Sequence, residues 1–247
     1  MKITEDFLTI NNWSRPGKKL ESILAIVMHW TANPRASAKA NRDYFEQRKC
    51  GSDGYGSAHY IIDQDGSVIH AIPDDEIAYH CGSNQIDPES KKIYTDYARQ
   101  IFGTYYTTEN RTPNFVSIGI ELCPLDKEGH FSAETYNSAI ELCKDLIEKF
   151  NLTVQDITTH HAVVGWKDCP KLWTDKPELF EKFKQDIEKE MTKPEPVIIK
   201  KEELKQPVII KKEEPKQPVV IKKEEPKQSS FIGLFIQILR RLLCGKR

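Results

Sequence analysis

The alternation of apolar and polar positions predicts an ordered N-terminal part with several strands. Residues 23–29 form a continuous apolar, β-branched run, which is typical of a strand buried on both faces. Residues 115–122 alternate apolar with small or polar side chains and predict a second strand. Between them, residues 58–63 and 67–72 flank a GlnAspGly turn, so they predict a β-hairpin.

Helical patterns follow the strand patterns along the chain. Residues 36–49 contain neither Gly nor Pro and are predicted to form a helix. Residues 132–150 repeat apolar side chains at helical spacing after Ser132, a favourable N-cap, and predict a second helix. A last helix is expected near Asp175, which would cap it ahead of a first-turn proline. Together these elements predict an α/β fold, a mixed central β-sheet flanked by helices, over residues 1–192.

The pattern changes after residue 192, where residues 193–228 are predicted to form a linker. It contains three copies of an 11-residue unit, at 196–206, 207–217 and 218–228. A period of 11 is also that of a right-handed helical supercoil, but proline recurs in every unit and interrupts a helix. We therefore expect a disordered, semi-rigid and solvated spacer, up to ~100 Å long if extended.

The C-terminal segment, residues 229–247, has a third pattern. Its apolar side chains fall on one face of a helix and its basic ones on another. The apolar face is formed by Phe231, Leu234, Phe235, Ile238, Leu239 and Leu242. Because the segment is too short to span a bilayer, we expect a cationic amphipathic helix that contacts a membrane surface. The alternative is that it docks on the body of the protein or on a second copy.

Charge is distributed unevenly between these parts. Residues 196–247 carry 13 Lys and Arg against six Glu, a net charge of +7, so residues 1–195 carry −8 of the total of −1. An acidic body lacks the basic face that nucleic-acid binding requires, so no nucleic-acid partner is expected. The N-terminal sequence lacks the features of a secretory signal peptide. We expect synthesis in the cytoplasm and release by another route.

Candidate metal ligands lie at separate places in the chain. His29 ends the predicted buried strand, and His161 and Cys169 lie eight residues apart in a later segment. Two imidazoles and a thiolate are the donors that hold a tetrahedral Zn²⁺ while leaving one position open. On chemistry alone, His160 is an equally plausible ligand.

The sequence resembles the zinc-dependent type 2 N-acetylmuramoyl-L-alanine amidases, which include phage endolysins and share their fold with peptidoglycan recognition proteins. Five segments in the same order carry the resemblance, over about residues 20–190. They are VMHWTA (27–32), SAHYIIDQDGSV (57–68), AYHCG (78–82), SIGIELC (117–123) and HAVVGWKDCP (161–170). Neither the repeats nor the C-terminal segment is covered.

The resemblance implies a role for each matching residue. His29, His161 and Cys169 match the three zinc ligands, with His161 preferred to His160 because the interval to the cysteine is eight. Glu121 matches the glutamate that acts as general base.

The remaining matches are one catalytic position, one position that lines the substrate groove, and two residues beside the site. Lys167 matches the lysine that stabilises the transition state, and His80 matches a position that lines the substrate groove. His59 and Tyr60 are expected beside the site. Some relatives have a catalytic tyrosine where this chain has Ala58, so Glu121 is expected to act without it.

The expected function is hydrolysis of the bond between N-acetylmuramic acid and L-alanine of the peptidoglycan stem peptide, with Zn²⁺ as cofactor. The lack of a signal peptide and the amphipathic tail favour a phage or prophage endolysin that reaches the cell wall after release. Two alternatives remain at this point: a non-catalytic peptidoglycan-binding module, and a zinc peptidase that cuts within the stem peptide.

Overall fold

The computed structural model describes residues 1–86 and 91–193, and residues 1–193 pack as one unit. The predictions for the repeats and for residues 229–247 lie outside the described residues. No described helix is long and apolar enough to cross a membrane.

The centre of this unit is a six-stranded sheet in the order β1-β4-β3-β5-β2-β6. All neighbouring strands are parallel except β3 and β4, which form the antiparallel hairpin predicted from the AspGly turn. The strands are β1 (Ile3–Glu5), β2 (Ala25–Trp30), β3 (Tyr60–Ile62), β4 (Val68–His70), β5 (Ser117–Leu122) and β6 (Ile157–Thr159). The predicted mixed α/β architecture is therefore confirmed.

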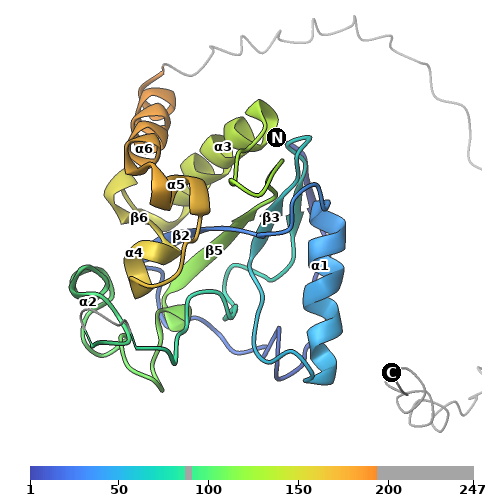
Figure 1. Cartoon of the computed structure of the whole chain (residues 1–247), viewed down its shortest axis with the longest axis vertical. Helices are drawn as coiled ribbons and strands as arrows, with labels where there is room; N and C mark the ends of the chain where they lie inside the picture. Colours follow the sequence, from blue (N-terminus) through green and yellow to red (C-terminus); the bar gives the residue numbers. More distant parts are fainter. Residues whose placement is uncertain (87–90, 194–247) are drawn as a thin grey trace, which may run out of the picture. The chain divides into compact units, whose positions relative to one another are not determined.

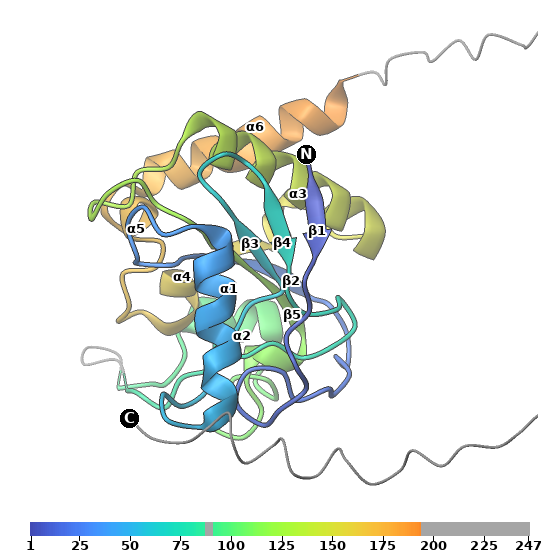
Figure 2. The same cartoon turned by 90° about the vertical axis from the view of Figure 1, so that its right-hand side faces the viewer.

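Helices cover both faces of the sheet, as Figures 1 and 2 show from two directions. The helices α3 and α6 pack on one face, and α1 lies on the other. The helices are α1 (Ala38–Gln47), α2 (Asp96–Phe102), α3 (Ala133–Phe150), α4 (His160–Val164), α5 (Lys171–Asp175) and α6 (Pro177–Thr192). Three short 3₁₀ turns add Arg48–Cys50, Pro113–Phe115 and Val154–Asp156.

The ends of α3 and α6 test the predicted caps. The side chain of Ser132 accepts a hydrogen bond from the backbone N–H of Thr135 at 2.9 Å, which confirms it as the N-cap of α3. Asp175, by contrast, ends α5 and forms an ion pair with Lys171, and α6 begins at Pro177 without a side-chain cap. The prediction that Asp175 caps the last helix was wrong.

The two central strands place alternate side chains in different environments. Met28 on β2 and Ile120 on β5 lie in the core beneath α3 and α6. Because successive side chains of a strand point to opposite faces, His29 and Glu121 lie on the other face. The parallel register pairs these two residues side by side. One face of β2 and β5 thus holds the main core, and the other brings two polar side chains together.

Candidate metal centre and active site

Three metal-binding side chains meet at the buried end of β2. They are His29, His160 and Cys169, whose ligand atoms all lie within 4.8 Å of one another. The Sγ atom of Cys169 lies 3.7 Å from Nδ1 of His29, and the two imidazole rings are 4.7 Å apart between centroids. All three side chains are buried, with at most 3% of any of them exposed.

The second imidazole of this cluster is that of His160, and the predicted ligand His161 lies outside it. His160 is the first residue of α4, directly after β6, which pairs with β2. Thr159 caps this helix by accepting from the N–H of Ala162 at 3.1 Å. Successive helical residues are turned by about 100°, so the next side chain, that of His161, points elsewhere. It is half-buried, and its Nδ1 lies 3.0 Å from the backbone oxygen of Lys167.

The residues of the cluster fit a zinc ion. Both ring nitrogens of His160 are buried without a hydrogen-bond partner among the described residues, which a polar group in a protein interior rarely tolerates. Burial, together with neighbouring charges, holds the pKa of His29 and of His160 well below the usual range, so both rings are neutral. Neutral imidazoles with a cysteine sulfur form a typical three-ligand zinc set with one open position.

Glu121 lies beside the cluster with one carboxylate oxygen unpaired. Its Oε2 atom is buried and has no hydrogen-bond partner in the described part of the chain. Burial raises the pKa of Glu121 to about 7, although the positive charge of Lys167 opposes this rise. Lys167 itself is exposed, on the loop between α4 and Cys169. A carboxylate whose pKa is near neutrality suits a group that accepts and returns a proton.

His80 contacts the cluster from the sheet side. Its Nδ1 lies 3.0 Å from Nε2 of His29, and its Nε2 lies 3.3 Å from the backbone oxygen of Ser117. Gly119 makes room for the ring, because a Cβ on Gly119 would lie 2.5 Å from it. Such contacts fix the orientation and tautomer of a metal-binding histidine. This contact could not be predicted from the sequence, since it depends on how a loop folds over β5.

The two remaining predicted site residues do not offer free groups to a substrate. His59 is buried, with Nδ1 accepting from the N–H of Gly119 at 3.0 Å and Nε2 at 2.9 Å from the backbone oxygen of Glu76. Tyr60 lies on the opposite face of the sheet, in the core beneath α3. Its hydroxyl donates to Asp74 at 2.7 Å. The prediction that Tyr60 lies beside the site was therefore wrong.

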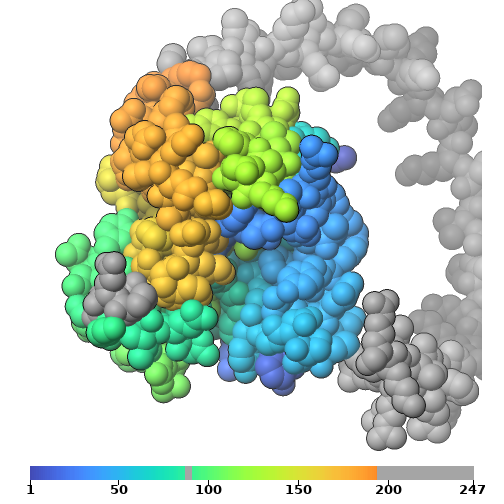
Figure 3. Space-filling model, viewed as in Figure 1, coloured from blue at the N-terminus to red at the C-terminus, as the bar shows by residue number. Residues whose placement is uncertain are grey.

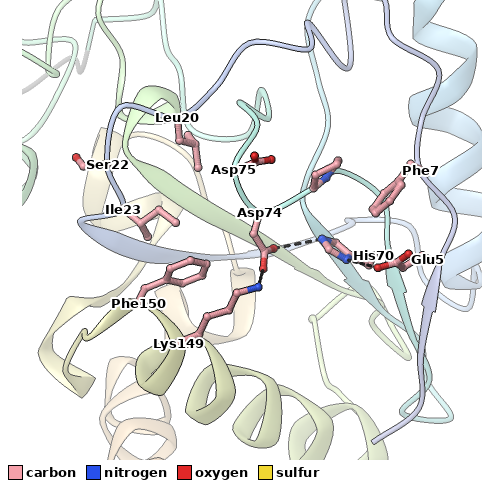
Figure 4. A pocket seen from close by; sticks show the side chains of 11 residues that line it. Glu5, Phe7, Leu20, Ser22, Ile23, His70, Asp74, Asp75, Lys149 and Phe150 are labelled. Carbon is pink, nitrogen blue, oxygen red and sulfur yellow. Dashed lines mark hydrogen bonds and ion pairs between the residues drawn. The ribbon is translucent and has the colours of Figure 1, made fainter.

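Tyr60 instead belongs to a separate polar group on the α3 side of the sheet. Figure 4 shows three other members of this group, His70, Asp74 and Lys149. Asp74 receives the Tyr60 hydroxyl and the Lys149 ammonium at 2.8 Å, and lies 3.2 Å from Nε2 of His70. The ring of His70 is stacked on that of Tyr60, with centroids 4.4 Å apart. A pocket of about 550 Å³ adjoins this group, but none of the cluster residues lines it.

Seen from outside, the surface is hollowed between the yellow segment around α4 and the blue helix α1 (Figure 3). The segments that carry His160 and Cys169 therefore border the hollow that α1 limits on its other side.

Comparison with known proteins agrees with this arrangement. The family model described as N-acetylmuramoyl-L-alanine amidase matches residues 19–172. A probable N-acetylmuramoyl-L-alanine amidase of Bacillus licheniformis is 34% identical over 173 residues, which are 70% of this chain and 43% of the relative. The amidase BlyA of Bacillus subtilis is 31% identical over 189 residues, covering 76% of this chain and 47% of BlyA. The chain thus spans about half the length of these relatives.

A solved structure extends the similarity to the fold. The catalytic domain of XlyA superimposes with a TM-score of 0.54 and 25% sequence identity, over 76% of this chain and 99% of that domain. The family match, residues 19–172, holds strands β2 to β6, the cluster and Glu121. On the family match and these relatives, the chain belongs to the N-acetylmuramoyl-L-alanine amidase family.

Proposed function

We propose that this protein is a zinc-dependent peptidoglycan amidase that hydrolyses the bond between the lactyl group of N-acetylmuramic acid and L-alanine of the stem peptide. The observation that carries the proposal is the buried set of His29, His160 and Cys169 beside the unpaired carboxylate of Glu121. The amidase names of the relatives support the choice of bond. A role as a phage or prophage endolysin remains part of the proposal.

The metal would be held by His29, His160 and Cys169. When bound, zinc supplies a Lewis acid that polarises a carbonyl and lowers the pKa of water. His80 would keep the ring of His29 in its ligating orientation through their 3.0 Å contact.

The protein's own groups then move the proton and stabilise charge. Glu121 is ionised in a substantial fraction of molecules near pH 7, so its free Oε2 accepts the proton of the attacking water. The same atom returns that proton to the nitrogen of the departing L-alanine. Lys167 provides a fixed positive charge for the oxyanion that develops on the lactyl carbonyl, and such a charge acts strongly near a poorly hydrated site.

Product analysis with one defined muropeptide tests the proposal. The zinc-loaded protein should release a peptide with a free L-alanine amino terminus and leave the lactyl carboxylate on the sugar, as read by mass spectrometry. Glu121→Gln should lower the rate by about 10²- to 10⁴-fold without lowering zinc content. Glu188→Gln, the same change on the exposed face of α6, should leave the rate unchanged.

Two results would contradict the proposed function. Stoichiometric zinc and binding to cell wall without cleavage would favour a peptidoglycan-binding module. Cleavage between amino acids of the stem peptide would favour a zinc peptidase.

A further inference from the structure

A second cavity, of about 740 Å³, is lined by Tyr79 and Gly82, which lie on either side of His80 in the chain. Three loop segments line it, at residues 54–55, 79–84 and 109–115. Of these segments, only His80 has a role in the site described above, and His80 itself does not line the cavity.

Asn114 joins this cavity to the cluster. Its Oδ1 accepts hydrogen bonds from the backbone N–H groups of His80, at 3.0 Å, and Cys81, at 2.8 Å. Because His80 also contacts His29, the cavity lies two contacts away from the proposed zinc ligand.

The side-chain amide nitrogen of Asn114, Nδ2, is available to a ligand. The side chain is 95% buried and lines the cavity, yet its Nδ2 forms no hydrogen bond with any described residue. The two bonds to Oδ1 fix which end of the amide faces the loop. Gly82 keeps Nδ2 uncovered, since a Cβ on Gly82 would lie 2.8 Å from it. The cavity therefore contains a fixed, unpaired N–H donor that selects a carbonyl oxygen.

An aromatic surface forms another wall. Tyr55 is 64% exposed, although its ring packs against Trp13 and Tyr79 with centroids 4.9 and 5.0 Å away. Two neighbouring rings therefore hold an exposed ring in place. Such a ring can cover the apolar face of a ligand at little cost in conformational entropy. The cavity has no Lys, Arg or His in its lining, and its one carboxylate is that of Glu109.

We propose that this cavity binds an N-acetylated sugar residue of the glycan strand. The acetamido carbonyl would accept the hydrogen bond of Asn114 Nδ2, and the sugar ring would cover Tyr55. The amide and hydroxyl side chains around the cavity match the neutral hydroxyl groups of such a sugar. This inference rests on the proposed function, because it assigns the glycan part of the same substrate to a site beside the reaction centre.

Binding of a soluble sugar tests this subsite without any cleavage. The probe is a β-1,4-linked tetramer of N-acetylglucosamine, added to the full zinc-loaded protein and followed by calorimetry and by the side-chain amide signals in NMR. The wild type should bind it and shift the Asn114 side-chain amide signal. The de-N-acetylated tetramer should bind at least about tenfold more weakly, since it lacks the carbonyl.

Variants separate the two contacts. Tyr55→Ala should weaken binding about tenfold, whereas Tyr55→Phe, which keeps the ring, should change it less than about threefold. Gly82→Ala should weaken binding about tenfold by covering Nδ2. Tyr55 is exposed, so its replacement tests the proposal even if Gly82→Ala fails to fold.

Other results would overturn the subsite. One is a lack of tetramer binding by a protein that still cleaves the muropeptide, which leaves the proposed function intact. Another is a shift of the Asn114 signal by a sugar-free stem peptide but not by the tetramer, with that peptide's binding lost in Glu109→Gln. Sugar binding with no amide cleavage would instead support the subsite and contradict the proposed function.

Discussion

Two neighbouring imidazoles, those of His160 and His161, have entirely different surroundings. The first is 3% exposed and has no hydrogen-bond partner among the described residues, whereas the second is half-buried beside the backbone oxygen of Lys167. A buried ring without partners is costly unless something else binds it. Replacing each histidine separately can therefore show which of the two is the second zinc ligand.

Replacing each histidine separately should give opposite results. His160→Ala should reduce both zinc affinity and amidase activity by more than about a hundredfold, because one of three ligands is removed. His161→Ala, the matched control one residue away, should retain zinc and keep activity within about threefold. Zinc content after dialysis and the rate on a defined muropeptide measure both effects.

The opposite pattern, with zinc lost only in His161→Ala, would restore the ligand set inferred from the eight-residue spacing. Loss of zinc in both variants would show that either change disrupts α4. The burial of His160 would then not be enough to identify it as the ligand.

The position of a residue could be predicted where the sequence carries a direct signal. Glu121 stands out because it interrupts an apolar strand, and the structure places it next to His29. The eight-residue interval to Cys169 did not point to His160, since the distance along a loop does not determine which side chain of a helix faces inward. The face of the sheet on which Tyr60 lies could not be predicted either, because two further apolar residues follow it and a run without alternation does not show which side chains share a face.

At the scale of elements, segments with a strong local pattern were predictable, including the short hairpin of β3 and β4 with its AspGly turn, and segments without such a pattern were not. The segments that became β2, β5 and α3 carry continuous runs, alternation or a cap within their own sequence. By contrast β1 and β6 have three residues each, and they are strands because they pair with β4 and β2. Such pairing is determined by distant residues, so a local pattern cannot predict it.

The group around Asp74 should stabilise the packing of the β3–β4 hairpin against α3. Burial alone would raise the pKa of Asp74, but contacts with His70, Lys149 and Tyr60 outweigh it and hold that pKa well below its usual range. A depressed carboxyl pKa stabilises the fold above the unfolded-state pKa of about 3.9, and this stabilisation is lost as the pH falls below it.

Asp74→Asn should therefore lower the free energy of unfolding by about 1–3 kcal/mol at pH 7. The difference from the wild type should shrink as the pH falls below about 4, as followed by urea denaturation. Asp75→Asn is the matched control, because Asp75 is exposed and its ion pair with Lys19 lies at the surface. A pH-independent difference, or equal effects of the two changes, would show that the Asp74 charge is not what stabilises the fold.

At the scale of the whole molecule, the sequence indicates a catalytic body followed by a spacer and a basic amphipathic segment. The body carries a net negative charge and residues 196–247 a net positive one. Anionic lipid surfaces attract basic segments, by about 1 kcal/mol per Lys or Arg near the surface. We therefore propose that residues 229–247 contribute membrane binding and that amide hydrolysis belongs to the body alone.

Deletion of residues 229–247 should leave the rate on isolated cell wall within about twofold of the full chain. Binding to vesicles that contain anionic lipid should fall at least about tenfold, as measured by co-sedimentation. Replacing Arg240 and Arg241 with Gln should weaken vesicle binding to a smaller extent. Equal vesicle binding by the full and shortened chains would contradict a membrane role, and a slower rate on isolated wall would favour docking on the body.

The unpaired carboxylate on β5 has an evolutionary consequence. Oε2 of Glu121 is buried without a partner among the described residues, which costs about 1–3 kcal/mol, so an apolar side chain at position 121 should make a sturdier protein that lacks the proposed proton acceptor. Directed evolution for heat resistance alone should repeatedly discard Glu121, whereas selection for bacterial lysis should retain it. Engineers who want a more durable enzyme should therefore search the α3 face of the sheet and leave this position unchanged.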